Sequence, residues 1–334
     1  YKRQNGEYWD KTIKALRIYV DCDIYITGSN AFLLSSELAT LISGRYVEIP
    51  MQPLTFAEYL DFRGATWQPA GKTGSDIASF ADGSFATLSN LFDQYRTFGG
   101  FPYLALQEPD ESVHRDYMRS IYQTIIVRDI MMRAQRKGLR AVNNQAALER
   151  ICAFMADNIG NETSINKIAG SLKADGQSAT RATTDFYIST LTEAYLFRHV
   201  LRYDVKGREL LKTGGKYYIA DVGMRNYLDS YRGTDTGRVL ENLVFNQLLF
   251  DGYDVLIGHL RGGEVDFVAT KPRCKMYIQV TENMQDEETQ RRELASLRRI
   301  GDEYRKIVVV GEGSYPSDID GIEIVNVIDF LLHR

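Results

Sequence analysis

Two parts of this 334-residue chain alternate short β-rich runs with amphipathic helices, and a mainly helical stretch lies between them. Strands that alternate with helices are typical of α/β units with a largely parallel sheet. One hydrophobic core rarely grows beyond about 250–300 residues, so a chain with two such parts is expected to form several domains. The predicted fold class is α/β, within a mixed α+β multidomain protein.

Composition and charge exclude several classes of protein. Hydrophobic residues make up 44% of the chain and charged residues 25%, which excludes a disordered or collagen-like chain. The formal net charge is −4, so any nucleic-acid site must be a local basic patch. The three cysteines and four histidines lack metal-binding spacing, which argues against structural zinc and disulfides and fits a reducing, cytoplasmic compartment. No apolar run reaches the about 18–20 residues that span a bilayer, so no membrane partner is expected.

Residues 1–60 predict part of a βαβ unit. A β-rich run at residues 24–26 precedes a Gly-Ser-Asn turn, and a helical apolar face and a second strand follow. Thr55 and Glu58 have the spacing of a capping box, which predicts the start of a short helix. Residues 61–140 are expected to form a loop or lid up to about residue 90 and then a helical region. The many arginines of that region favour a solvated helical face, with a phosphate-facing patch as the alternative.

Residues 141–232 predict a winged-helix domain. Thr163 and Ser178 are expected to cap two successive helices, with Tyr195 facing inward at the end of the second. Two short β runs around basic turns follow. A helix-turn-helix with a β-hairpin places its second helix in a DNA major groove and the hairpin beside it.

The cations of this domain are the candidate DNA contacts. Arg181 lies at the start of the second helix, where base edges and phosphates are contacted. The other candidates lie along the hairpin: Arg202, Lys206, Arg208, Lys212 and Lys216. Nearby acids dilute the positive charge, and the same architecture also serves protein–protein interaction, so the sequence leaves DNA binding and partner binding both open.

The chain contains no phosphate-binding loop of the GxxxxGK[ST] type. In the run Gly71-Lys72-Thr73 the required upstream glycine is replaced by Thr66, and no apolar strand leads in. Other segments resemble one bacterial and archaeal group of AAA+ ATPases: IYITGSN, SGRYVEIPMQPLTFAEYL, FDQYRTFGGFPYLAL, KYYIADVGMRNYL, and VLENLVFNQLLFDGYDV with GEVDFVA. The resemblance implies that Asn30 is the sensor-1-like residue that faces the γ-phosphate. It also makes Arg45 a candidate phosphate-facing or subunit-facing arginine, and a helix-end arginine is the alternative.

Residues 233–334 resemble the restriction-endonuclease-like PD-(D/E)xK fold. Such nucleases hold a divalent metal with a helix glutamate, an aspartate and a further acid two positions before a lysine. The matching positions here are Glu241, Asp266, Gln279 and Thr281. Gln279 is neutral and Thr281 carries no positive charge, so the domain is expected to have lost cleavage and to hold no metal. Glu282 is predicted to point to the opposite face of its strand from Gln279.

The resemblance implies the C-terminal part of a AAA+ ATPase that couples nucleotide state to DNA or partner binding. The ATP-binding half would lie upstream, because it was removed or is naturally absent, and the missing initial Met favours a fragment. The chain alone is therefore expected not to hydrolyse ATP and to need no cofactor, whereas ATP and Mg²⁺ would serve the full-length protein. DNA and further copies of the chain are the expected partners, and no small-molecule substrate is identified. A non-catalytic DNA-binding or scaffold protein is the alternative, and an active metal nuclease is disfavoured by Gln279 and Thr281.

Overall fold

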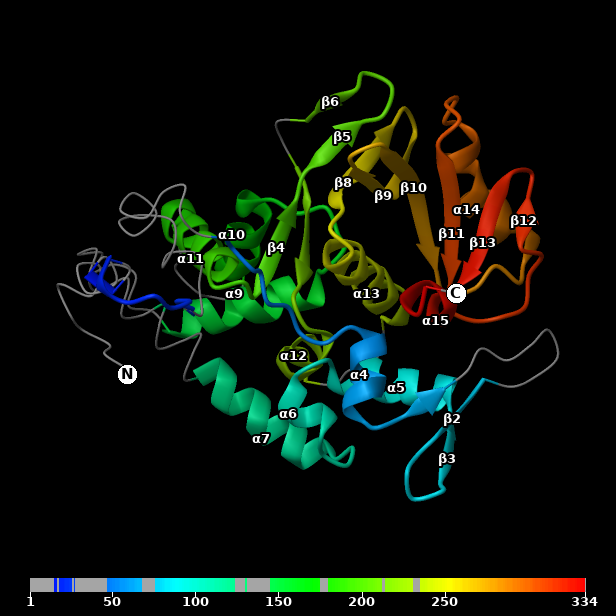
Figure 1. Ribbon diagram of the computed structural model, residues 1–334. Coiled ribbons are helices and arrows are strands. Elements are labelled where there is room, and N and C mark those ends of the chain that lie inside the picture. The colour runs from blue at the N-terminus through cyan, green and yellow to red at the C-terminus, as the bar shows by residue number, and fades with distance from the viewer. Residues whose placement is uncertain are drawn as a thin grey trace.

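The computed structural model describes residues 15–16, 18–25, 27, 47–67, 76–123, 130, 145–174, 180–211, 214–230 and 235–333. Helix α13 (Thr236–Phe250) lies near the centre of the molecule, between a group of helices and a large sheet (Figure 1). This combination of helices with a mixed sheet confirms the α/β fold class. Within the described ranges, no helix is both long enough and apolar enough to cross a bilayer.

An eight-stranded mixed sheet dominates the C-terminal part. Its strands lie in the spatial order β12 (Asp318–Ile319), β13 (Ile322–Asn326), β11 (Arg305–Val310), β10 (Cys274–Thr281), β9 (Gly263–Lys271), β8 (Asp254–Leu260), β5 (Arg202–Asp204) and β6 (Glu209–Leu210). Strand β11 runs parallel to β10 and β13, whereas β8, β9 and β10 form antiparallel pairs.

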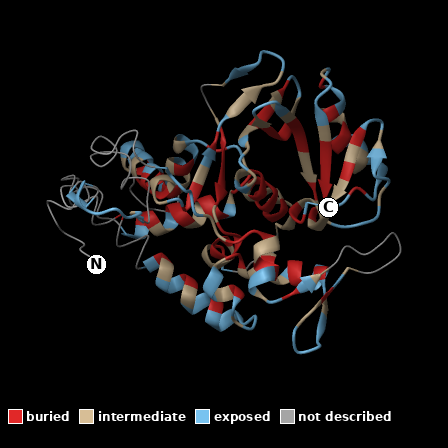
Figure 2. Ribbon diagram, viewed as in Figure 1, coloured by how far each residue is buried: buried red, intermediate tan, exposed pale blue. Residues whose placement is uncertain are grey.

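Helices cover both faces of this sheet. Helices α13 and α15 (Val327–Leu331) pack on one face, and α14 (Glu287–Arg298) packs on the other. Because side chains alternate along a strand, Ile307 and Val309 join the α13 core while Val308 and Val310 join the α14 core. Figure 2 shows the buried residues concentrated along α13 and in the central strands.

Among its described residues, the part predicted as a winged helix includes three successive helices and a two-stranded antiparallel sheet. These elements are α9 (Gln145–Asp157), α10 (Ile165–Ala174), α11 (Arg181–Glu193), β4 (Phe197–Val200) and β7 (Lys216–Ile219). The predicted caps were displaced by one and two residues: Ser164 Oγ accepts from Lys167 N at 3.2 Å, and Thr180 Oγ1 accepts from Thr183 N at 3.1 Å. The inward placement of Tyr195 was wrong, because α11 has already ended and the exposed Tyr195 has a left-handed φ of 59°.

The first part of the molecule packs against α13. It comprises α4 (Phe56–Phe62), α5 (Leu88–Phe98), α6 (Pro102–Ala105), α7 (Glu111–Ile121) and, from later in the chain, α12 (Val222–Leu228). The predicted capping box is confirmed: Glu58 N donates to Thr55 Oγ1 at 3.2 Å, and Thr55 N donates to Glu58 Oε2 at 2.9 Å. Phe56 and Leu60 share one continuous core with Leu243 of α13, which joins the start of the chain to the sheet.

A small sheet occupies the segment predicted as a loop or lid. It consists of the antiparallel strands β1 (Thr66–Trp67), β2 (Ile77–Ser79) and β3 (Phe85–Thr87). The strands are only two or three residues long, and they lie in a Gly-, Ser- and Asp-rich segment, so no apolar alternation marks them in the sequence.

The β5–β6 hairpin belongs to the large sheet. Strand β5 pairs in parallel with β8, and Val205 N donates to the carbonyl of His259 at 3.1 Å. The predicted units 141–232 and 233–334 therefore share one sheet across their boundary.

Several residues singled out in the sequence lie outside the described ranges. They are Asn30, Arg45, the Gly71-Lys72-Thr73 run, Lys212 and much of the arginine-rich segment after residue 123. Their predicted roles stay predictions.

Candidate functional site

A lysine lies inside a group of carboxylates where the helical part meets the large sheet. The Lys216 Nζ lies 2.6 Å from Glu264 Oε1, 3.1 Å from Glu241 Oε1 and 3.7 Å from Asp266 Oδ1. The Lys216 side chain is only 7% exposed. We call Lys216 and these three acids the lysine–carboxylate cluster.

Three different elements bring the cluster together. Lys216 begins β7, Glu241 lies in the second turn of α13, and Glu264 and Asp266 lie two residues apart on β9. The Tyr218 hydroxyl, two residues after Lys216 on β7, donates to Glu241 Oε1 at 2.5 Å. Residues two apart on a strand share a face. Strand β7 therefore supplies both donors, and β9 supplies two of the acceptors.

Burial and mutual charge set the protonation of the cluster. Burial lowers the pKa of Lys216, but Glu241, Asp266 and Glu264 together outweigh it and raise the pKa above the ordinary lysine value. Burial, followed by the charge of Glu241, raises the pKa of Asp266 well above its ordinary value, and Lys216 opposes this rise. The ammonium is therefore charged at neutral pH, and the cluster has excess negative charge that is costly to bury.

The positions that match a nuclease only partly converge. Glu241 and Asp266 meet at Lys216, and Gln279 lies beside Asp266, whose N–H donates to Gln279 Oε1 at 3.4 Å. The Gln279 amide instead donates to Glu293 Oε2 at 3.0 Å. Thr281 Oγ1 donates to the carbonyl of Asn283 at 3.1 Å and contacts none of the cluster acids.

The residues present do not fit a divalent metal. The predicted nuclease-like positions would place a metal beside Glu241 and Asp266, where the Lys216 ammonium lies at 3.1 Å and 3.7 Å from their oxygens. The other predicted ligand, Gln279, offers a neutral oxygen, and Glu282 accepts a hydrogen bond from Thr236 Oγ1 instead. In the part of the chain that the structure describes, no group of three or more His, Cys, Asp or Glu side chains is arranged to hold a metal.

Two amides of α13 hold strand β7 in register beside the cluster. Asn242 accepts from Ile219 N and donates to Ile219 O, both at 2.8 Å, and is fully buried. Asn246, one turn later, donates to the carbonyl of Ala220 at 3.1 Å. Because α13 also carries Glu241, these bonds fix the position of Lys216 relative to its partners.

The same strand continues into a second buried junction. The Asp221 carboxylate caps α12, where it accepts from Met224 N at 3.0 Å, and it also accepts from Gly100 N at 2.7 Å. Gly99 has a φ of 80°, and a Cβ there would overlap the Asp221 carboxylate. Burial raises the pKa of Asp221 to about 6, although the N–H groups of Gly100, Met224 and Gly223 oppose the rise.

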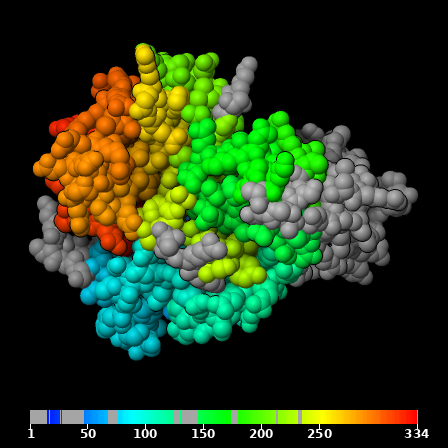
Figure 3. Space-filling view, turned by 180° about the vertical axis from the view of Figure 1, so that it is seen from behind, coloured from blue at the N-terminus to red at the C-terminus, as the bar shows by residue number. Residues whose placement is uncertain are grey.

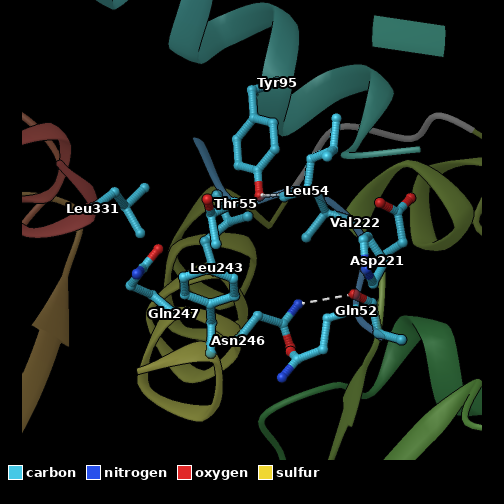
Figure 4. A pocket seen from close by; sticks show the side chains of 13 residues that line it. Gln52, Leu54, Thr55, Tyr95, Asp221, Val222, Leu243, Asn246, Gln247 and Leu331 are labelled. Atoms are coloured by element: carbon cyan, nitrogen blue, oxygen red, sulfur yellow. Dashed lines mark hydrogen bonds between the residues drawn. The ribbon is translucent and has the colours of Figure 1, made fainter. Parts of the chain in front are cut away.

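A pocket lies beside this junction, between residues 52–55 and helix α13. Figure 4 shows Tyr95, Asp221 and Asn246 on its walls. The Tyr95 hydroxyl donates to the carbonyl of Leu54 at 2.8 Å, and the neighbouring Asn246 is bonded to Ala220. The polar groups of the walls therefore bind the protein itself.

The candidate DNA contacts differ in their exposure and in whether other side chains of the protein already bind them. Arg181 at the start of α11 is exposed, as are Lys206 and Arg208 in the β5–β6 turn. Arg202 instead pairs with Glu162 at 2.9 Å, and its Nη2 lies 2.9 Å from His259 Nδ1. The prediction for Lys216 was wrong, because its buried side chain binds carboxylates of the chain itself.

Sequence reasoning missed three members of the site. Glu264 could have been found from its spacing, because it shares a strand face with Asp266. Lys216 and Tyr218 have the same spacing in KYYIAD, but the sequence did not indicate that β7 packs against α13.

Comparisons with known proteins agree with part of this picture. Residues 4–60 match the AAA domain family, and residues 89–235 match a domain of unknown function, DUF8612. The first match confirms the AAA-type relationship of the start of the chain, up to α4. Both matches end before α13 and the cluster acids.

The chain is similar in sequence to two relatives over most of its length. An uncharacterized protein of Haemophilus influenzae is 36% identical over 326 residues, which cover 98% of this chain and 75% of that protein. The uncharacterized protein MJ1544 of Methanocaldococcus jannaschii is 30% identical over 269 residues, so the alignment covers 79% of this chain but only 56% of the relative. Protein VC1899 of Vibrio cholerae is 14% identical, with a TM-score of 0.24 and coverage of 87% of this chain and 63% of that one.

Proposed function

We propose that this chain, which belongs to the same family as the uncharacterized protein of Haemophilus influenzae, is the recognition part of a AAA-type ATPase, and that its nuclease-like module binds DNA without cutting it. The observation that carries this proposal is the lysine–carboxylate cluster. The Lys216 ammonium lies within ion-pair distance of Glu241 and Asp266, where a nuclease would place its metal. The module keeps the acids of a nuclease and uses them to bind a strand of its own chain.

The AAA-type region supplies the second element of the proposal. ATP and Mg²⁺ would serve the full-length protein, and this chain would sense the nucleotide state of the upstream part. Support comes from the shared core, in which Leu54 and Phe56, at the end of the AAA match, pack with Leu243 of α13. A displacement of residues 54–60 would therefore change the packing of the core that α13, the helix with Glu241, also forms.

DNA recognition is assigned to the exposed cations near the start of α11 and in the β5–β6 turn. Arg181 lies where a helix N-terminus contacts phosphates and base edges, and Lys206 and Arg208 lie in an exposed turn. No carboxylate among the described residues forms an ion pair with any of these three side chains.

Duplex binding and cleavage test the proposal in one experiment. Arg181→Ala and Lys206→Ala should each weaken duplex binding and reduce the slope of log K against log salt by about 0.9 per lost phosphate contact. Arg291→Ala, an exposed arginine of α14 that pairs with Glu287, is the matched control and should behave as wild type. The bound DNA should stay intact with Mg²⁺ or Mn²⁺. Cleavage that disappears in Asp266→Asn would refute the proposal.

Hydrolysis tests the AAA-type element separately. A version of the protein that extends upstream should hydrolyse ATP, and DNA should change the rate. If the extended protein binds DNA but does not hydrolyse ATP, the alternative of a non-catalytic DNA-binding or scaffold protein takes its place.

A further inference from the structure

Three tyrosines surround a lysine ammonium on the α14 side of the large sheet. The Lys275 Nζ lies 4.8 Å from the ring centre of Tyr277, 5.2 Å from that of Tyr304 and 5.4 Å from that of Tyr203. These residues come from β10, β5 and the segment before β11, so the fold rather than local sequence assembles them. We call Lys275 and the three rings the tyrosine–lysine patch.

The members of the patch differ in exposure. Tyr277 is fully buried, and its hydroxyl donates to Asp302 Oδ2 at 2.6 Å, so it forms the floor. Tyr203 and Lys275 are half-buried, and Tyr304 is 50% exposed. The cation held between the rings orients them. The patch therefore presents one half-exposed ring, Tyr304, above a rigid base.

Further positive charge lies beside the patch. Burial lowers the pKa of Lys275, and the charge of Arg208 in the β5–β6 turn adds to this, whereas Asp302 opposes it. Arg208 and Lys206 are both exposed. Among the described residues, no carboxylate lies within ion-pair distance of Lys206, Arg208 or Lys275. The Lys275 ammonium, the exposed Arg208 and the half-exposed Tyr304 ring thus lie near one another on the α14 side of the sheet. Figure 3 shows this part of the surface from behind, where the β5–β6 hairpin (green) borders β8 to β10 (yellow to orange) in the upper part of the view.

We infer that this face binds an unpaired nucleic-acid strand, with a base stacked on Tyr304 and phosphates bound by Lys275 and Arg208. An aromatic ring beside unpaired cations is the chemistry of single-strand binding, because every unpaired base has a face that can stack. A duplex hides those faces, so it would gain only the phosphate contacts. The inference rests on the proposed nucleic-acid recognition. It specifies that the surface beside the β5–β6 hairpin binds a single strand.

The test measures binding of labelled oligothymidylate and oligouridylate of about 20 nucleotides, which is longer than one binding site of this kind. Tyr304→Ala should weaken binding about 5- to 100-fold, whereas Tyr304→Phe keeps the ring and should stay within about twofold of wild type. The matched control is Tyr103→Ala, because Tyr103 in α6 is 49% exposed and lies far along the chain from the patch; it should bind as wild type. The tighter of the two oligonucleotides identifies the strand as DNA or RNA.

Salt dependence tests the phosphate contacts independently. Arg208 has a left-handed φ of 57°, so Arg208→Asn removes the charge while placing a residue that tolerates this conformation. This variant should reduce the salt slope for a single strand by about 0.7, and Tyr304→Phe should leave the slope unchanged.

Four outcomes would overturn the inference. It is overturned if Tyr304→Ala binds oligonucleotide as wild type does, or if Tyr304→Ala weakens binding of a duplex of the same length as much as it weakens binding of the single strand. Duplex binding that depends on Arg181 together with no single-strand binding would overturn this inference and leave the proposed function in place. Binding of neither form would overturn both.

Discussion

Lys216 and Glu241, 25 residues apart in the chain, are joined by an ion pair of 3.1 Å, and Tyr218 donates to the same Glu241 oxygen. The pair joins the first residue of β7 to the central helix α13. Since Glu264 and Asp266 of the large sheet contact the same ammonium, one lysine connects three elements of the fold. The site is thereby a structural junction.

Removal of the lysine should be strongly destabilising. Lys216→Met leaves three neighbouring carboxylates without their cation, and loss of one partner from a buried pair costs about 3–5 kcal/mol. Lys206→Met, at an exposed lysine in the β5–β6 turn, is the control and should stay within about 0.5 kcal/mol of wild type. Urea unfolding at neutral pH measures both.

The Lys216→Met deficit should also depend on pH. Lys216 opposes the rise in the pKa of Asp266, so the variant raises that pKa further. A group with a raised folded-state pKa loses stability as the pH rises, hence the deficit should shrink on acidification from pH 8 to pH 5. A deficit of constant size would show that the lost side chain matters through packing alone.

Asp221 should make wild-type stability fall between weakly acidic and neutral pH. Its pKa of about 6 lies above the ordinary 3.8, so the folded state binds the proton more tightly than the unfolded chain. Stability is greatest below the unfolded pKa and decreases as the pH rises through 6, by about 2 kcal/mol between pH 4.5 and 7.5. Asp221→Asn keeps an acceptor oxygen for the α12 cap and should lack this decrease.

Asp110, the exposed N-cap residue of α7, should have the opposite effect on the pH dependence of stability. Hydrogen bonds from Val113 N and from Ser112 lower the pKa of Asp110. The contribution of its carboxylate should therefore be present above the unfolded pKa and lost as the pH falls. If Asp110→Asn and Asp221→Asn changed the pH profile in the same direction, the burial assigned to Asp221 would be wrong.

Two helical glycines should respond in opposite ways to alanine. A Cβ at Gly223 in α12 would overlap the backbone carbonyl of Phe98, which cannot move without shifting α5, so Gly223→Ala should destabilise by about 1–3 kcal/mol. Gly170 in α10 faces open space, so Gly170→Ala should stabilise by about 0.5–1 kcal/mol. Thermal unfolding of both variants checks the tight contact between α12 and the end of α5.

The hydroxyl of Tyr218 should contribute through its bond to a carboxylate. Tyr218→Phe keeps the ring, which stacks on Phe245 with ring centres 4.4 Å apart, and removes only the donor. A hydrogen bond to a charged group is worth about 1.5–3 kcal/mol, so unfolding should become easier by that amount. Equal stability would mean that Lys216 alone satisfies Glu241.

Local signals in the sequence predicted the elements better than they predicted how the elements meet. The capping box at Thr55 follows from the spacing of Thr55 and Glu58, and it is confirmed. The short strands β1–β3 were missed because a run of two or three residues is too short to show a strand periodicity. Glu241 and Asp266 were placed from a resemblance, and the structure brings them together at Lys216.

Lys216 itself was assigned to phosphate binding because a lysine in a basic turn is usually exposed. Its burial follows from non-local pairing: Asn242 holds β7 against α13, and β9 then faces the lysine with two acids. No pattern within 10 residues of Lys216 encodes that contact. The charge pattern of the sequence therefore indicated which residue types form the site. It did not indicate that Lys216 is the buried cation.

Binding of Mn²⁺ to the protein without nucleotide tests the central claim most directly. The account holds that the Lys216 ammonium occupies the position of the metal among Glu241, Glu264 and Asp266. Titration of wild type and Asp266→Asn, followed by the water-proton relaxation of Mn²⁺, should give identical curves, because the cluster takes up no metal in either. A Mn²⁺ site that is present in wild type and lost in Asp266→Asn would contradict the account, because it would show that these carboxylates bind a metal.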